Sequence, residues 1–468
     1  MPPGSSWEGV IIDTERVAVE CERAADAVPR LVPRLAEGIE LIGEYQGSGF
    51  QEPRYLVRRA DGQMIQLPRL LYLLVVALDG QRDLVQVAGV LSAEFGRLVQ
   101  AQQVSYLIDN RLRPAGIVAA DPQAADANGP AKMTVKSDPL LAFKFRVGVV
   151  PARAVWRIAG VFQPMFSPPV ILAALAAFVA LDVVIIVRGG PGQIVPSVLA
   201  LVYQPALTLL VLGMVLASAA FHECGHVSAC RYGGAQPGVM GFGLYLVWPA
   251  LYSTVTDSYR LNRAGRLRTD LGGVYFNTVF IAGMSLAYLH TASPWLLAAI
   301  VLLHIETATQ FLPMIRLDGY YILSDLVGVP DLFSWIGPVL LSAIPGRGAH
   351  PRVRELKPWV RRTITLWVGI VVPSLVYWVV GFVIVVPRVL PVVWARLVEL
   401  SQAVGADAAA GQVAEATLDG VDIILLVLPW VGSVLLLIMI VRWPVEAMLR
   451  RRARGSLASS PGVLGTFR

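Results

Sequence analysis

Six long apolar stretches constrain the fold of this chain more than any other sequence feature. Each is long enough for a helix to cross the roughly 30 Å hydrocarbon core of a bilayer. Only 15% of the residues are charged, against about a quarter in soluble proteins. We therefore expect a mainly α-helical polytopic membrane protein with about six transmembrane helices. The stretches cover residues 170–187, 206–229, 271–289, 295–315, 364–386 and 421–441.

Basic residues alternate between the connections that join these stretches. The connection after the second stretch is rich in arginine, whereas the one after the first contains only Arg188. Further basic runs follow the fourth and the sixth stretch. The positive-inside rule then places both termini in the cytoplasm. We expect an integral protein of the cell membrane, embedded in the lipid bilayer.

The segment before the first apolar stretch is predicted to be soluble. Leu41 to Leu67 suggests two or three short strands, with turn residues at Gly47-Ser48-Gly49 and Asp61-Gly62. Helical periodicity follows, in an order typical of a small α+β winged-helix-like domain. The boundaries that we predict are a soluble domain at 1–118, a linker at 119–137, a membrane core with four transmembrane helices at 138–345, and a C-terminal membrane region with two transmembrane helices and a basic tail at 346–468.

The sequence His222-Glu223-x-x-His226 lies near the end of the second apolar stretch. Two histidines at i and i+4 project from one face of a helix, so both imidazoles can reach one Zn²⁺ ion. Glu223 lies beside them and can accept a proton from metal-bound water. The alternative is a polar cluster packed between helices, but isolated ionisable groups are costly inside a membrane.

A catalytic zinc site needs a third protein ligand and one open position. We expect Asp318 to be that ligand, because the second and fourth stretches both run toward the cytoplasm and end at similar depth. The alternative is that Leu317-Asp318-Gly319 forms only a turn at the end of a helix. The prediction is one Zn²⁺ per chain.

Together these residues resemble the site-2 protease family of intramembrane zinc metalloproteases. The resemblance covers about residues 140–345 and implies zinc held by His222, His226 and Asp318, with Glu223 as the general base. Pro313 matches the family's second motif, but Gln310 stands where the family usually has Asn. The resemblance implies that Gln310 and Pro313 contribute to substrate binding. The segment VMGFGLYLVWPALYSTVTD is similar to the family's membrane-associated hairpin, which accepts an extended substrate, although an inert connection is the alternative.

Two more ionisable residues, His304 and Glu306, lie inside the fourth apolar stretch. Residues of this kind within a membrane span are candidates for function. Glu306 and Gln310 are one helical turn apart and could line a water path to the zinc. They could instead pair with each other or with a neighbouring helix.

The N-terminal domain resembles the leader-peptide recognition element of ribosomal peptide modification systems. The resemblance covers residues 30–118 and rests on Leu78-Asp79-Gly80 between helices, followed by a Leu-rich helix. It implies that a leader peptide adds as a strand to the sheet edge; a purely structural role is the alternative. We expect no nucleic-acid partner, because the region has mixed charge and no clearly basic helix.

These features favour a zinc metalloendopeptidase that cleaves a peptide precursor or a membrane-associated substrate near the cytoplasmic face, in the maturation or export of a modified peptide. One alternative is a non-catalytic membrane protein that binds peptide, as an export partner or an immunity protein. Another is a regulatory protease that releases a membrane-anchored transcription factor.

Overall fold

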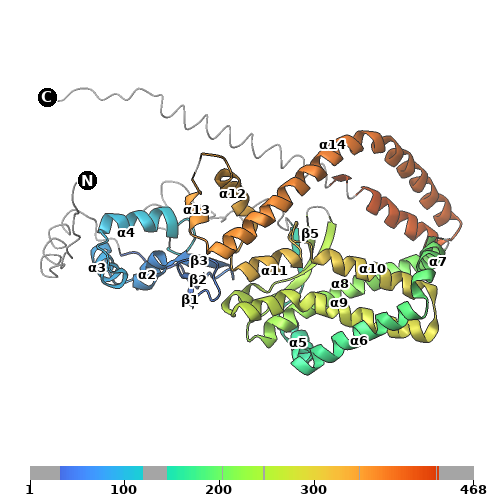
Figure 1. Cartoon of the computed structure of the whole chain (residues 1–468), viewed down its shortest axis with the longest axis horizontal. Coiled ribbons are helices and arrows are strands. Elements are labelled where there is room, and N and C mark those ends of the chain that lie inside the picture. Colours follow the sequence, from blue (N-terminus) through green and yellow to red (C-terminus); the bar gives the residue numbers. More distant parts are fainter. Residues whose placement is uncertain are drawn as a thin grey trace. The chain divides into compact units, whose positions relative to one another are not determined.

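The computed structural model describes residues 32–119, 145–202, 204–245, 248–346, 348–427 and 430–431. The chain folds into two compact units, Met1–Lys136 and Ser137–Arg468, and each is described by itself (Figure 1). All of the predicted linker after Ala119 lies outside the described residues.

The first unit begins with a three-stranded antiparallel sheet in the order β1-β2-β3. Its strands are β1 (Glu40–Glu44), β2 (Arg54–Arg58) and β3 (Met64–Pro68). Gly47 and Gly62, in the connections between these strands, adopt positive φ angles of 75° and 80°. Glycine has no Cβ to oppose that conformation, so the predicted turn chemistry is what reverses the chain.

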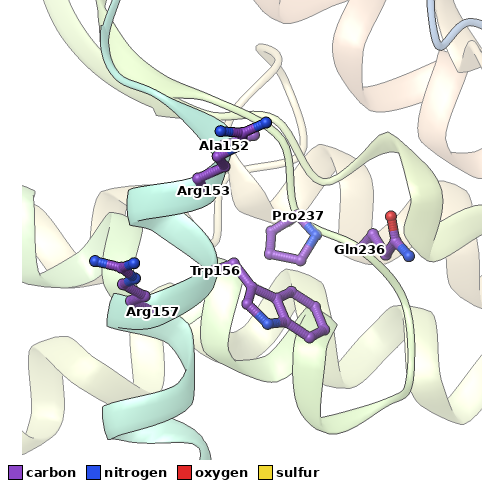
Figure 2. A pocket seen from close by; sticks show the side chains of 6 residues that line it. All are labelled: Ala152, Arg153, Trp156, Arg157, Gln236 and Pro237. Carbon is purple, nitrogen blue, oxygen red and sulfur yellow. The ribbon is translucent and has the colours of Figure 1, made fainter.

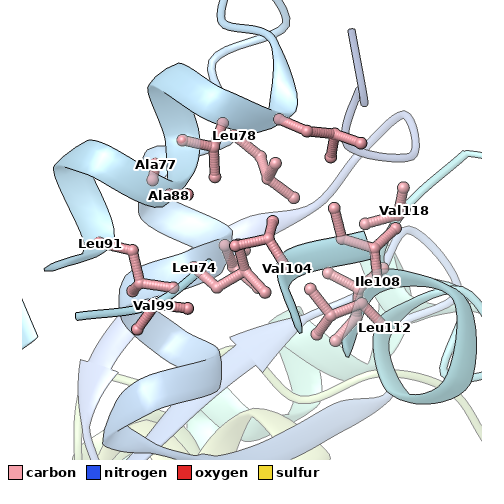
Figure 3. Packing of buried hydrophobic residues seen from close by; sticks show 14 of the residues in the cluster. Leu74, Ala77, Leu78, Ala88, Leu91, Val99, Val104, Ile108, Leu112 and Val118 are labelled. Carbon is pink, nitrogen blue, oxygen red and sulfur yellow. The ribbon is translucent and has the colours of Figure 1, made fainter. Parts of the chain in front are cut away.

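Helices follow the sheet and cover it with a compact apolar core. They are α2 (Arg69–Ala77), α3 (Leu84–Phe95), α4 (Ala101–Leu107) and the π-helical turn η2 (Ile108–Leu112). The core gathers fully buried side chains from these helices, including Leu74, Leu91, Val104 and Leu112 (Figure 3), together with Val57 of β2. Asp83 begins α3 with a capping box, in which its carboxylate accepts hydrogen bonds from Val85 N and Gln86 N. The small N-terminal sheet region is thus confirmed, while its role in peptide binding stays a prediction.

The second unit is mainly helical. Its longer helices are α5 (Ala152–Phe162), α6 (Pro168–Val187), α7 (Gly190–Val202), α8 (Pro205–Tyr232), α9 (Arg263–Thr291), α10 (Pro294–Gln310), α11 (Asp318–Val327) and α14 (Pro358–Ala409). Short elements complete it: η3 (Gln163–Phe166), η4 (Thr256–Arg260), η5 (Leu332–Trp335), α12 (Ile336–Ser342) and α13 (Pro351–Arg354). Residues 413–427 are helical as well.

Helices α8 and α9 pack at very short distance because glycines face each other at their crossing. A Cβ added to Gly225 of α8 would lie 2.7 Å from the carbonyl carbon of Gly272 on α9. A Cβ added to Gly272 would lie 2.6 Å from the Gly225 carbonyl oxygen. Small residues allow such close backbone approach between membrane helices, and here it brings α9 against the face of α8 that carries the two histidines.

Four helices of the described residues are long and apolar enough to cross a membrane, or five if one bent pair counts as a span. The four are Pro168–Val187, Ala206–Tyr232, Arg263–Thr291 and Pro358–Gly381; the pair is Asp318–Val327 with Leu332–Ser342, bent by 62°. The membrane character is supported, but the predicted count of about six is not confirmed. The fourth predicted span is shortened to α10, because the helix ends at Gln310, just ahead of Pro313. Most of the sixth, 421–441, lies outside the described residues.

The second unit also contains an antiparallel sheet in the order β4-β5-β6. In the sequence, β4 precedes α5, and β5 and β6 lie between α8 and α9. Its strands are β4 (Phe145–Val150), β5 (Met240–Tyr245) and β6 (Trp248–Ser253). The hairpin predicted after the second span is therefore present as β5 and β6. Strand β4, which was not predicted, pairs with one edge of β5, and β6 pairs with the other. The outer edge of β6 is not paired with another described strand.

Candidate metal centre

Three side chains from two helices converge on one point in the second unit. His222 and His226 lie on α8, and Asp318 is the first residue of α11. One ligand atom from each lies within 4.8 Å of the other two. All three side chains are largely enclosed, with exposed fractions of 8%, 10% and 14%. The structure therefore brings together the three residues that the sequence predicted as metal ligands.

The distances between the ligand atoms fit a small cation. His222 Nε2 lies 3.0 Å from His226 Nε2 and 3.1 Å from Asp318 Oδ2. His226 Nε2 lies 3.4 Å from Asp318 Oδ1. A tetrahedral zinc with bonds of about 2.0–2.1 Å separates its ligands by about 3.3 Å. The observed distances of 3.0–3.4 Å are close to that value, with each histidine nearest a different oxygen of Asp318.

Two buried polar atoms of this cluster support the same conclusion. Among the described residues, His222 Nδ1 and Asp318 Oδ2 have no hydrogen-bond partner, although each is inaccessible to solvent. Buried polar atoms are normally satisfied, and exceptions call for an explanation such as an ion. Asp318 Oδ2 lies 3.1 Å from His222 Nε2, and a cation held between these atoms would supply the partner that Oδ2 lacks.

The backbone of α9 orients the second histidine. His226 Nδ1 lies 2.8 Å from the carbonyl oxygen of Thr269. A carbonyl only accepts hydrogen bonds, so the imidazole proton resides on Nδ1, and this network assigns the tautomer. The lone pair of His226 Nε2 then points toward Asp318 and is available to a metal, as is typical of metal-binding histidines.

Asp318 begins helix α11, whereas the sequence interpretation placed it at the end of the fourth span. Helix α10 stops at Gln310, and residues 311–317 lead to an extended Leu317 before α11 starts. A Cβ added to Gly319 would lie 2.9 Å from the α-carbon of Phe311, so only glycine allows this close return of the chain. A carboxylate in the first turn is also favoured by the helix dipole.

A buried ion pair fastens α11 to α9 two turns beyond Asp318. Arg266 Nε donates to Asp325 Oδ1 at 3.2 Å, and Arg266 Nη1 donates to the Leu261 carbonyl at 2.8 Å. The Arg266 side chain is fully buried and that of Asp325 is 7% exposed. Neither residue was among the site residues predicted from the sequence. The ion pair fixes the helix that carries the third ligand.

Glu223 follows His222 on α8 and its side chain is half-buried. It lies outside the cluster of three ligands, as a general base must. Its role as the general base stays a prediction.

Gln310 and Pro313 have partners inside the protein. Gln310 Nε2 donates to Glu306 Oε1 at 2.8 Å, and the Pro313 carbonyl accepts from Trp367 Nε1 at 2.8 Å. The other carboxylate oxygen of Glu306 accepts from Asn277 Nδ2 at 3.3 Å. Glu306 thus pairs with Gln310 and with a neighbouring helix, as the structural alternative proposed, and substrate binding by Gln310 and Pro313 stays a prediction. The sequence interpretation missed Asn277, although a polar residue within an apolar span was a signal.

His304 has an interhelical role of the same kind. Its Nε2 lies 3.1 Å from Asp182 Oδ2 on α6, and its ring stacks on Phe178 with centroids 5.5 Å apart. These contacts join α10 to α6, away from the three ligands.

Comparison with curated proteins finds a relative in Bacillus subtilis (strain 168), named "Putative peptide zinc metalloprotease protein YydH". The two sequences are 24% identical over 165 residues, which is 35% of this chain and 58% of the relative. The chain thus matches little more than half the length of that protein. No family model and no solved structure matches the chain. The relative's name is consistent with a zinc protease and with the cluster of His222, His226 and Asp318.

Proposed function

We propose that this chain is a membrane zinc metalloendopeptidase that cleaves a peptide precursor or a membrane-associated substrate near the cytoplasmic face. The observation that carries the proposal is the convergence of His222, His226 and Asp318 at zinc-like spacing. The relative named as a peptide zinc metalloprotease supports it.

His222 Nε2, His226 Nε2 and one carboxylate oxygen of Asp318 hold the metal in this proposal. Zinc bound there would act as a Lewis acid and would lower the pKa of water at the site. Glu223 takes the proton from that water and delivers it to the leaving amine nitrogen. Thr269 keeps His226 in the tautomer that can bind the metal.

An extended substrate fits the sheet that follows the metal-binding helix. Strands β5 and β6 come directly after α8, and the outer edge of β6 has no paired strand among the described residues. A peptide that adds as a strand gains main-chain hydrogen bonds whatever its sequence. In this proposal the N-terminal unit binds the leader segment of the substrate and brings it to the membrane. A substrate with such a leader would be a peptide made in the same cell.

The decisive experiment measures zinc per chain in detergent-purified full-length protein, for the wild type and for Asp318→Ala. About one zinc in the wild type and a sharp loss in the variant are expected, since a two-ligand site binds zinc weakly. No zinc in folded wild type would contradict the proposal and favour the non-catalytic peptide-binding alternative. The same preparation is then tested with a leader-bearing peptide and with a single-span membrane protein. Cleavage of the peptide would support peptide maturation, and cleavage of the membrane protein would support regulatory cleavage.

A further inference from the structure

A surface hollow of about 450 Å³ lies beside the first turns of α5, apart from the metal centre. Its walls come from α5 and from the loop that follows α8. The lining residues are Ala152, Arg153, Trp156, Arg157, Gln236 and Pro237. Figure 2 shows the Trp156 ring beside α5 and next to Pro237, while Arg153 and Arg157 extend from successive turns of α5 in different directions. The hollow has a flat apolar floor and two cationic side chains at its rim.

The floor of the hollow is held in place by a third arginine. The Arg231 guanidinium stacks on the Trp156 ring at 4.0 Å from its centroid and donates to the Trp156 carbonyl oxygen. A Cβ added to Gly160 would lie 2.8 Å from Arg231 Cζ, so that glycine makes room for this stack. The Trp156 ring is therefore fixed by α8, and a cation–π contact adds positive charge beneath it.

The charge at the rim is uncompensated. Arg153 and Arg157 are both exposed, and within the described ranges neither forms a salt bridge. None of the six lining residues is acidic. A guanidinium is planar and always charged, and it binds phosphate oxygens through two parallel hydrogen bonds. The chemistry of the hollow therefore suits a phosphate group.

The surroundings indicate that this phosphate belongs to a lipid. Helix α5 leads through η3 directly into α6, the most apolar of the candidate spans. Only 6% of the residues in the α6 window are buried and most of the others are exposed, so this helix presents a broad apolar surface to the surroundings. Tryptophan and arginine at the end of a membrane span are typical of the lipid headgroup level.

We propose that this hollow binds the phosphate headgroup of an anionic phospholipid. Arg153 and Arg157 contact the phosphate, and Trp156 packs on the glycerol and upper acyl region. The opposite wall belongs to the loop that leaves the metal-binding helix, where Gln236 N donates to the buried Asp257 Oδ2 at 2.8 Å. A bound headgroup thus bridges α5 to the segment that joins α8 to β5.

The test is native mass spectrometry of the full-length protein in detergent, titrated with phosphatidylglycerol or phosphatidylcholine. The variant Arg153→Gln/Arg157→Gln removes both rim charges. The control Arg188→Gln/Arg388→Gln removes two charges from exposed positions elsewhere in the same unit. We expect the rim variant to lose about tenfold or more in phosphatidylglycerol affinity, on the basis of what basic residues contribute near anionic lipid. The control should change less than about twofold, and phosphatidylcholine should bind weakly to all.

Equal losses in the rim variant and the control would overturn the proposal, because they would show a general charge effect. An unchanged rim variant would overturn it as well. Inorganic phosphate serves as a competitor: displacement of the lipid by an equal concentration of phosphate would show that the hollow prefers a soluble phosphate and would overturn the proposal. Arg153→Lys/Arg157→Lys keeps both charges but lacks the planar guanidinium, so it should bind more weakly than the wild type and more tightly than the glutamine variant, which separates loss of charge from loss of fold. The measurement needs neither zinc nor peptide cleavage, so it is independent of the proposed function.

Discussion

Gly273 of α9 lies against the His222 imidazole with no room for a methyl group. A Cβ added at this position would lie 2.5 Å from His222 Cε1 and 2.5 Å from His226 Nε2. Helix α9 therefore packs directly against both imidazoles at Gly273. The candidate metal site thus depends on a glycine that has neither a ligand atom nor a charge.

Replacing Gly273 by alanine should weaken the site. The added methyl must displace an imidazole, and overpacking of this kind costs about 1–3 kcal/mol. We expect zinc to be lost to a chelator faster than from the wild type, with a lower unfolding temperature in detergent. Gly283→Ala is the matched control, because a Cβ at Gly283 on the same helix meets nothing within 4 Å. Similar behaviour of the two variants would contradict the role of Gly273.

Glu223→Gln should separate metal binding from catalysis. The substitution keeps the size of the side chain and leaves His222, His226 and Asp318 in place, so zinc content should stay near that of the wild type. Loss of a general base costs about 10²–10⁴-fold in rate. The measurements are zinc per chain and the initial rate of peptide cleavage. An active Glu223→Gln protein would remove Glu223 from the mechanism.

Arg266→Ala should destabilise α11 and loosen the third ligand. Removing one partner of a buried ion pair costs about 3–5 kcal/mol, because the buried Asp325 carboxylate loses the charged side chain that it pairs with. We expect a lower unfolding temperature and weaker zinc retention together. The control is Arg396→Ala, which breaks an exposed pair with Glu399 at 2.8 Å, and such pairs contribute about 0–1 kcal/mol. Unchanged zinc retention in Arg266→Ala would show that the ion pair does not position Asp318.

Asp79 should make the first unit sensitive to acid. Its carboxylate accepts hydrogen bonds from Gln81 N and Arg82 N, which lowers the pKa of Asp79 below its ordinary value. A lowered folded-state pKa contributes stability that is present above the unfolded value of about 3.9 and is lost as the pH falls through the folded value. Amide exchange of Gln81 and Arg82 should therefore accelerate below about pH 4, relative to the intrinsic rate. In Asp79→Asn the protection of the Gln81 and Arg82 amides should not change as the pH falls below about 4. If the wild type and the variant lost protection in parallel, the pH dependence would belong to another group.

The sequence alone determined the parts of this protein that follow from local geometry. Two histidines four residues apart must share a helical face, long apolar stretches require a membrane, and Gly62 could be placed in a strand connection because of its backbone freedom. Asp318 was also found from sequence, although the helix that it begins was not, since the sequence interpretation carried the span beyond Gln310 to residue 315.

Only the tertiary structure decided how the site is held together. Gly273, the Thr269 carbonyl and the ion pair of Arg266 with Asp325 act across helices that are distant in sequence. From the sequence, Glu306 could either line a water path or pair with other side chains. In the structure it pairs with Gln310 and with Asn277 of a neighbouring helix. Periodicity reports which face of a helix is apolar, but not which helix packs against it or how closely. Those choices depend on side-chain volumes and polar partners at the crossings, which exist only once the chain has folded.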